Sequence, residues 1–147
     1  NQFIIEEHRQ ELLEDYRSRV WINDTKATNI DASLQVIDLY KNKKIHLIVG
    51  GDDKGVDNNP LFEFIKNLDI ALYTIGKNET VLNTLAKKYN VSCTPCSTLV
   101  NAIGAIDALH TNQSVAILAP AAASLDQFKS YKERGTLFKN TIKNLKD

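Results

Sequence analysis

Three polar segments of the sequence carry residue types that bind charged ligands, and each follows a short apolar run. They are NDTKATN (23–29), GGDDKG (50–55) and PAAASLDQF (120–128). In the second segment, Lys54 is a compact cation that can meet a carboxylate or a phosphate. In the third, Ser124 follows small residues at an expected helix N-terminus, where free amides and a hydroxyl accept anions. We therefore expect an anionic ligand.

Simpler structural roles are compatible with the same three segments. Asp24 and Lys26 lie two residues apart, and with the nearby hydroxyls they would also suit a polar N-capping loop. GGDDKG would suit an exposed turn: it is no GxxxxGK[ST] phosphate loop, and its aspartates lack the EF-hand spacing for calcium. Ser124 would suit a plain helix cap. Spacing alone leaves both interpretations open.

Cys93 and Cys96 form a C-x-x-C motif, the arrangement used by thioredoxin-like proteins. The motif comes late in the chain, and no second cysteine pair completes a zinc site. We expect two packed or incidental thiols in a reducing cytoplasm. A thiol–disulfide module using these two residues stays open as an alternative function.

Length and charge limit the remaining possibilities. At 147 residues the chain is expected to form one domain, and 18 lysines and arginines balance 18 aspartates and glutamates. This balance gives no sign of a nucleic-acid or membrane partner. The chain contains no methionine, so we expect it to be a piece of a longer protein.

The elements that must position the polar segments alternate between strands and helices. Apolar runs predict strands at 20–23, 45–49, 70–75 and 115–119, and helical periodicity predicts helices at 31–42, 60–68, 79–89, 97–109 and 135–145. The charged segment 8–19 suits either a helix or a strand. The pattern predicts a Rossmann-like α/β fold: a mostly parallel sheet of about five or six strands with helices on both faces. All three polar segments should then share the carboxyl edge of the sheet.

Four stretches together resemble the C-terminal domain of the Mur ligases, which build peptidoglycan precursors. They are HR (8–9), INDTKATN (22–29), GGDDK (50–54) and PAAASLDQFKSYKERG (120–135). The resemblance covers nearly the whole chain and is closest to members that add D-glutamate. It implies that residues 1–147 form the amino-acid-binding domain, and that the UDP-binding and central ATPase domains lie outside this chain.

The resemblance also implies a reaction. In this family ATP phosphorylates the carboxylate of UDP-N-acetylmuramoyl-L-alanine, and the amine of D-glutamate attacks the acyl phosphate to form an amide. ATP and Mg²⁺ would be bound mainly by the absent central domain, so this chain alone should be inactive. The protein is expected to be a cytoplasmic monomer. A ligand-free Rossmann-like interaction domain is the remaining alternative.

Site residues are carried over by position from the same resemblance. For ATP, Arg9 and Lys26 would lie near the phosphates and Asp24 would bind the ribose hydroxyls. For D-glutamate, the matching positions are Thr28 and Lys54 at the α-carboxylate, and Ser124, Leu125 and Phe128 at the side-chain carboxylate. No catalytic residue is expected on this chain alone, and no metal ligand.

Overall fold

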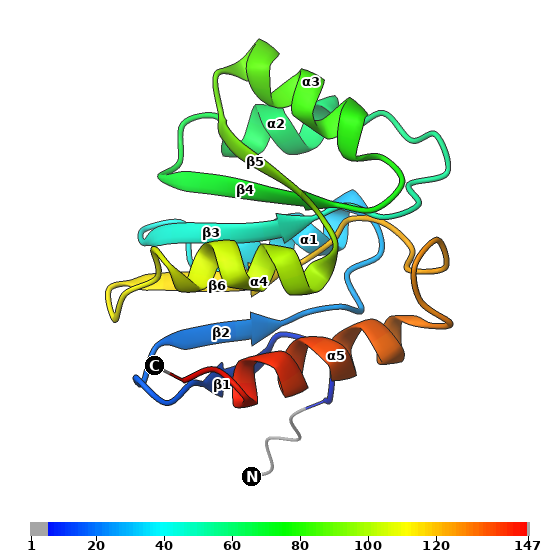
Figure 1. The fold of residues 1–147 in the computed structure, drawn as a ribbon. Helices are drawn as coiled ribbons and strands as arrows, with labels where there is room; N and C mark the ends of the chain where they lie inside the picture. The colour runs from blue at the N-terminus through cyan, green and yellow to red at the C-terminus, as the bar shows by residue number, and fades with distance from the viewer. Residues whose placement is uncertain (1–5, 147) are drawn as a thin grey trace, which may run out of the picture.

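The centre of the protein is a six-stranded sheet with the strand order β1-β2-β6-β3-β4-β5 (Figure 1). The computed structural model describes residues 6–146. The strands are β1 (Glu11–Glu14), β2 (Val20–Asn23), β3 (Lys44–Val49), β4 (Ile70–Ile75), β5 (Ser92–Ser97) and β6 (Ser114–Leu118). Only the β1–β2 pair is antiparallel, and the other four pairs are parallel. The predicted α/β class is confirmed.

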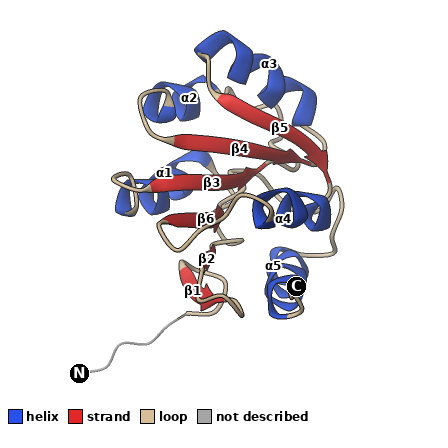
Figure 2. Cartoon of the chain, turned by 60° about the vertical axis from the view of Figure 1, so that its left-hand side comes forward, coloured by secondary structure: helices blue, strands red, loops and turns tan. Residues whose placement is uncertain are grey.

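Helices cover both faces of the sheet (Figure 2). The described helices are α1 (Ile30–Leu39), α2 (Asn59–Ile65), α3 (Glu79–Tyr89), α4 (Leu99–Asp107) and α5 (Tyr131–Lys143). One apolar core lies beneath α1, α2 and α3 and includes Leu47 and Phe62. A second core lies beneath α4 and α5 and includes Trp21 and Phe138. Full burial of such large apolar side chains contributes about 1.5–3 kcal/mol each.

The four predicted strands are present because their sequences are apolar at nearly every position. Strands β4 and β6 are buried throughout, and β3 is buried after its first residue. A parallel sheet that is covered on both faces requires such continuous apolar runs. The prediction for 79–89 also matches α3 at both ends.

Two edge strands escaped prediction. The ambiguous segment 8–19 contains β1, which alternates between half-buried and exposed residues. The C-x-x-C motif lies inside β5, whose sequence SCTPCS resembles a loop more than a strand. Pro95 is tolerated there because β5 is at the edge of the sheet, where one row of backbone groups needs no partner.

Four helices start at other residues than predicted: α1 and α2 begin one residue earlier, and α4 and α5 differ by more. Helix α4 begins at Leu99, two residues after the predicted start, because Thr98 caps it: the Thr98 side chain accepts a hydrogen bond from the Asn101 amide. Helix α5 begins at Tyr131, where Ser130 caps it, so Gly135 lies inside the helix. The position of this glycine has a packing cause: a Cβ there would lie 2.2 Å from Nδ1 of His8. No helix of the described residues is long and apolar enough to cross a membrane.

Candidate functional site

Three loops meet at the carboxyl edge of the sheet, on the right in Figure 1. We call them the Asp24 loop (24–29), the Lys54 loop (50–58) and the Ser124 loop (119–130). They follow β2, β3 and β6, which are neighbours in the sheet. Backbone hydrogen bonds connect them: Ala121 donates to Ala27 (3.0 Å), and Asp52 and Ala123 exchange two bonds of 2.9 Å each. The expectation that the three segments share one edge is confirmed.

The three residues assigned to ATP lie together. A cavity of about 200 Å³ is lined by Arg9, Gln10, Asp24, Lys26, Ala27, Ala32 and Gln35. The segment that carries Arg9 crosses the Asp24 loop, because the Lys26 amide donates to the His8 carbonyl (3.1 Å). The Gln10 amide donates to Oδ1 of Asp24 (3.3 Å). Residues that are far apart in the sequence thus form one pocket with both charge signs.

Charges in this pocket are arranged for an anion beside a hydroxyl-bearing group. Glu6 pairs with both Arg9 (3.1 Å) and Lys26, so one carboxylate marks where the two cations converge. Asp24 is 4% exposed. Burial raises its pKa to about 6, against the opposing effects of the Gln10 amide and Arg9. Its carboxylate is therefore mostly ionised at neutral pH and can accept hydrogen bonds from hydroxyls.

The paired glycines of the Lys54 loop are explained by contacts with protein backbone. A Cβ on Gly50 would lie 2.0 Å from the Ile75 carbonyl oxygen, and one on Gly51 would lie 2.4 Å from that of Ala123. Both glycines have φ angles in the region that side chains disfavour, +126° and +146°. The close approaches at these two glycines are made by the end of β4 and by the Ser124 loop.

The two aspartates of the Lys54 loop shape it through hydrogen bonds. Oδ1 of Asp52 accepts from the Lys54 amide (3.0 Å), and Asp53 accepts from the side-chain amides of Asn58 (2.7 Å) and Asn78 (2.9 Å). Lys54 itself has a positive φ of 56°. Its side chain is exposed, and its ammonium has no ion-pair partner within residues 6–146. The loop therefore presents a free cation.

The helix expected to begin at Ser124 is absent, and a turn stands in its place. The Ser124 carbonyl accepts from the amides of Gln127 (3.1 Å) and Phe128 (2.8 Å). Ser124 is buried, yet its hydroxyl makes no hydrogen bond in the described part of the chain, and neither do the amides of Leu125 and Asp126. Three donors thus remain free beside one another without a helix.

The five residues assigned to D-glutamate lie on the three connected loops, but their side chains differ in environment. Thr28 and Lys54 are exposed, Leu125 is 67% exposed, and Phe128 packs against the core beneath α4 and α5. Among the described residues no hydrogen bond or ion pair joins these five side chains. The structure brings their loops together and leaves the side chains separate.

Arg134 is a site-edge residue that the sequence did not reveal. It is 1% exposed, and its guanidinium donates to the Thr25 hydroxyl (2.8 Å), the Thr25 carbonyl (2.8 Å) and the Ala122 carbonyl (3.2 Å). It therefore ties the Asp24 loop to the Ser124 loop. Burial lowers its pKa to about 10, partly offset by Asp126. An arginine in an amphipathic helix normally faces solvent, so its sequence position gave no signal.

The C-x-x-C motif does not form a redox pair. Cys93 packs against the core beneath α1, α2 and α3, whereas Cys96 belongs to the core on the other face. Burial raises the pKa of both thiols, that of Cys93 to about 11, so neither is a ready nucleophile. The geometry therefore does not support the thiol–disulfide alternative.

Comparison with known proteins gives a consistent result. No family model matches the chain. The chain is 50% identical over 147 residues to the UDP-N-acetylmuramoylalanine--D-glutamate ligase of Helicobacter pylori (strain HPAG1), and 47% identical over 145 residues to the Campylobacter jejuni enzyme of the same name (strain 81-176). The alignments cover 100% and 99% of this chain but 34% and 36% of those enzymes. The chain thus spans about a third of the relatives that it matches.

Solved structures share the fold at low sequence identity. Folylpolyglutamate synthase of Thermotoga maritima matches 94% of this chain and 32% of its own, with a TM-score of 0.64 at 18% identity. MurF ligase of Thermotoga maritima in complex with ADP matches 95% of this chain and 31% of its own, with a TM-score of 0.59 at 14% identity. Over its whole length the chain is therefore a relative of the C-terminal part of UDP-N-acetylmuramoylalanine--D-glutamate ligases, with a fold that it shares with MurF ligase and folylpolyglutamate synthase.

Proposed function

We propose that this chain is the C-terminal, amino-acid-binding domain of an ATP-dependent ligase that joins D-glutamate to UDP-N-acetylmuramoyl-L-alanine in peptidoglycan precursor synthesis. The observation that carries the proposal is the 50% identity over the whole chain to an enzyme named for D-glutamate ligation. The meeting of the three predicted loops at one sheet edge supports it. In this proposal the remainder of the ligase lies outside residues 1–147.

The pocket around Asp24 is proposed to receive ATP as the domain closes. Arg9 and Lys26 converge on one carboxylate, and a phosphate oxygen can replace that carboxylate between them. Asp24 can accept the ribose hydroxyls. Mg²⁺ is assigned to the ATPase part of the ligase, together with most of the phosphate contacts. This chain then completes a nucleotide site from one side.

The Lys54 and Ser124 loops are proposed to hold the two carboxylates of D-glutamate. A doubly anionic amino acid needs two separate anion sites, and each loop has unused donors. The free ammonium of Lys54, with Thr28, would bind the α-carboxylate. The Ser124 hydroxyl and the free amides beside Leu125 would bind the side-chain carboxylate, with Phe128 supporting the turn from the core.

The chemistry follows from this placement. ATP supplies a phosphoryl group that activates the substrate carboxylate as an acyl phosphate. The amine nitrogen of D-glutamate forms a bond to the acyl carbon, the bond to the phosphate oxygen breaks, and the amine loses a proton. This chain would accelerate the step by orienting the amine, since fixing reacting groups can supply about 7–11 kcal/mol of the barrier. In this proposal the ligase works as a monomer in the cytoplasm.

The test is phosphate release by the full-length protein with ATP and UDP-N-acetylmuramoyl-L-alanine. D-glutamate, L-glutamate and meso-diaminopimelate are supplied separately, and the isolated chain serves as the control. We expect turnover with D-glutamate alone and none from the isolated chain. Turnover with another amino acid would reassign the loops, and no turnover with any of them would refute the ligase.

A further inference from the structure

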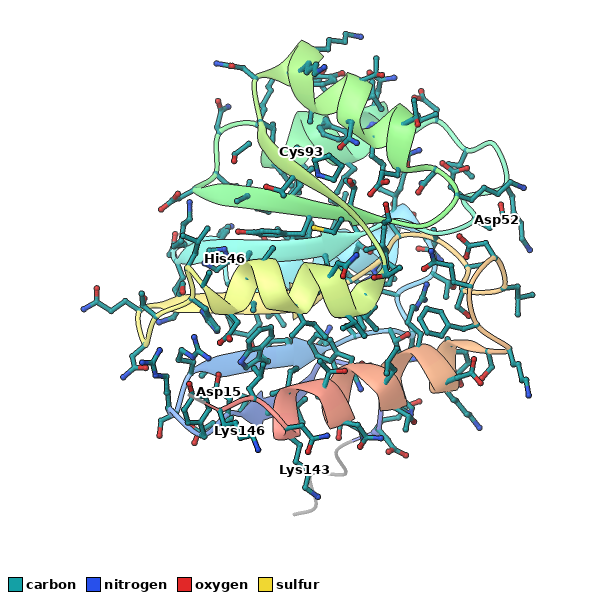
Figure 3. All side chains as sticks on the ribbon, in the orientation of Figure 1. Asp15, His46, Asp52, Cys93, Lys143 and Lys146 are labelled. Carbon is teal, nitrogen blue, oxygen red and sulfur yellow. The ribbon has the colours of Figure 1, made fainter. Side chains whose placement is uncertain are left out.

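The turn between β4 and α3, residues 76–78, contacts both loops to which we assign the carboxylates. It follows a different strand from either loop and carries none of the residues assigned to a substrate. Its contacts run to the Lys54 loop on one side and to the Ser124 loop on the other. The turn therefore lies where it can set the distance between them. Asp52 marks this region at the right of Figure 3.

Asn78 holds the Lys54 loop through three hydrogen bonds. Its Oδ1 accepts from the Gly51 amide (3.0 Å), and its backbone amide donates to the Gly51 carbonyl (3.1 Å). Its Nδ2 donates to Oδ2 of Asp53 (2.9 Å). Asn78 is only 6% exposed, so solvent cannot easily replace these bonds. Both residues that it binds lie close to Lys54 in the sequence.

The same turn holds the Ser124 loop through Asp126. Oδ2 of Asp126 accepts from the Lys77 amide (2.7 Å). The neighbouring Gln127 donates from Nε2 to the Ser97 carbonyl (2.8 Å), and that carbonyl also accepts from the Gly76 amide (3.2 Å). Both loop residues lie within three positions of Ser124. These bonds fix the position of the Ser124 loop, and with it the position of the free donors, relative to the turn.

Gly76 is the point where the three segments meet. It has φ +78°, and a Cβ there would lie 2.7 Å from Oδ2 of Asp126 and 2.7 Å from Cα of Gly51. No side chain fits without moving one of the two loops. The two hydrogen bonds between Asp52 and Ala123 already join the Lys54 and Ser124 loops near the sheet. The turn therefore acts on the parts of the two loops that lie beyond these bonds.

We propose that Asn78 and Asp126 are positioning residues that fix the spacing of the two carboxylate sites, and thereby select an amino acid with the chain length of glutamate. The inference rests on the proposed function and extends it to the basis of specificity. Neither side chain touches the substrate in this scheme, although the backbone amide of Asp126 is one of the proposed donors to the side-chain carboxylate. Each acts through the loop that it holds, so its removal should weaken amino-acid binding and blur length selection without affecting ATP.

The first test is Asn78→Ala in the full-length protein, with Asn83→Ala as the matched control. Asn83 lies on α3, and its side chain bonds Thr74 and Cys93 but neither loop. We expect Asn78→Ala to raise the KM for D-glutamate about tenfold, the factor expected for roughly one net hydrogen bond. The KM for ATP should stay within twofold, and the control should change neither value.

The second test measures length selection. One methylene is worth about 10- to 200-fold in a site of fixed size. We expect the kcat/KM ratio of D-glutamate over D-aspartate to fall at least threefold in Asn78→Ala and in Asp126→Ala. Asp126→Asn keeps an oxygen acceptor for the Lys77 amide, so it should restore the ratio. Asp126 is exposed, so its variants keep the test decisive if Asn78→Ala does not fold.

The outcomes separate this inference from the proposed function. A wild-type protein that turns over D-glutamate, with an unchanged KM and an unchanged length ratio in the folded variants, overturns the positioning role alone. A rise in the KM for ATP equal to that for D-glutamate also overturns it, because the effect would then be a general loss of structure. A wild-type protein without D-glutamate turnover overturns both.

Discussion

Two buried arginines stand at opposite ends of β2, and their surroundings differ. Arg19 precedes the strand, is 2% exposed and pairs with Asp15 (2.8 Å) and Asp107 (2.5 Å). Arg134 lies beyond the strand's other end, at the loop edge, and its acceptors are a hydroxyl and two carbonyls. Burial opposes the charge of both, but the carboxylates raise the pKa of Arg19, whereas the pKa of Arg134 falls to about 10.

The rest of each end follows the same contrast. Near Arg19 the polar groups are closed pairs: Nδ1 of His110 contacts the Ser114 hydroxyl (2.7 Å), and Nδ1 of His46 contacts the Tyr73 hydroxyl (2.9 Å). Asp15 and His46 mark that end at the left of Figure 3. The loop edge instead keeps a free ammonium, free amides and an arginine without a carboxylate. The polar groups of one end are thus satisfied within the protein, whereas the other end keeps free donors that suit the charged ligand proposed above.

The largest effect should come from Arg19→Met. It would leave the fully buried Asp15 carboxylate without its cation, which costs roughly 3–5 kcal/mol of unfolding free energy. Urea denaturation measures the loss. Lys41→Met, which breaks an exposed pair with Asp38, is the control and should change stability by less than about 1 kcal/mol. Equal losses in the two variants would remove the stabilising role from Arg19.

Arg134→Met should destabilise less, by roughly 1–3 kcal/mol, because it strands carbonyl and hydroxyl acceptors but no carboxylate. The same urea titration compares it with Arg19→Met. In the full-length protein we also expect loss of ligase activity, since two loops lose their common tie. A loss of stability as large as that of Arg19→Met would break the contrast between the two ends.

Asp24→Asn should stabilise the protein at neutral pH. The folded-state pKa of Asp24 is raised from 3.8 to about 6, so the stability linked to its proton is present below pH 4 and is lost as pH rises through 6. We expect a gain of roughly 1–2 kcal/mol at pH 7 that shrinks towards pH 4. Denaturation of both proteins across this range tests it. A gain that does not depend on pH would contradict the assignment to this carboxyl.

Lys54→Ala should have the smallest effect on stability and a clear effect on function. The ammonium has no ion-pair partner among the described residues, so the urea midpoint should not move. The KM for D-glutamate in the full-length protein should rise at least tenfold, because a charge-assisted bond to a carboxylate is lost. An unchanged KM would remove Lys54 from the site.

Much of the fold was predictable because a sheet covered on both faces demands continuous apolar strands. The runs at 45–49, 70–75 and 115–119 could hardly be read otherwise. The two edge strands lack that demand, so β1 kept two glutamates and β5 kept a proline. The start of α4 was displaced by two residues because Ser97 and Thr98 are adjacent hydroxyl residues and either type can cap a helix.

The site was predictable only in part. The pattern of strands placed the three loops on one edge, since parallel strands that share a direction end together. It did not predict Asn78, Asp126 or Arg134, whose partners lie 27, 49 and 109 residues away along the chain. Contacts across such separations depend on which loops pack together. The local periodicity of the sequence predicts helices and strands but not the packing of loops.

Gly135, inside α5, has a consequence for how the N-terminal part of the domain moves with the rest. His8 occupies the space where a side chain at position 135 would project, and its carbonyl accepts from the Lys26 amide. The segment that carries His8 is therefore fixed against α5 on one side and against the Asp24 loop on the other. Arg9 follows His8 directly, so in the proposed closure its backbone would move together with α5 and the Asp24 loop. In the proposed ligase, closure of this domain would therefore also bring Arg9 to the ATP phosphates.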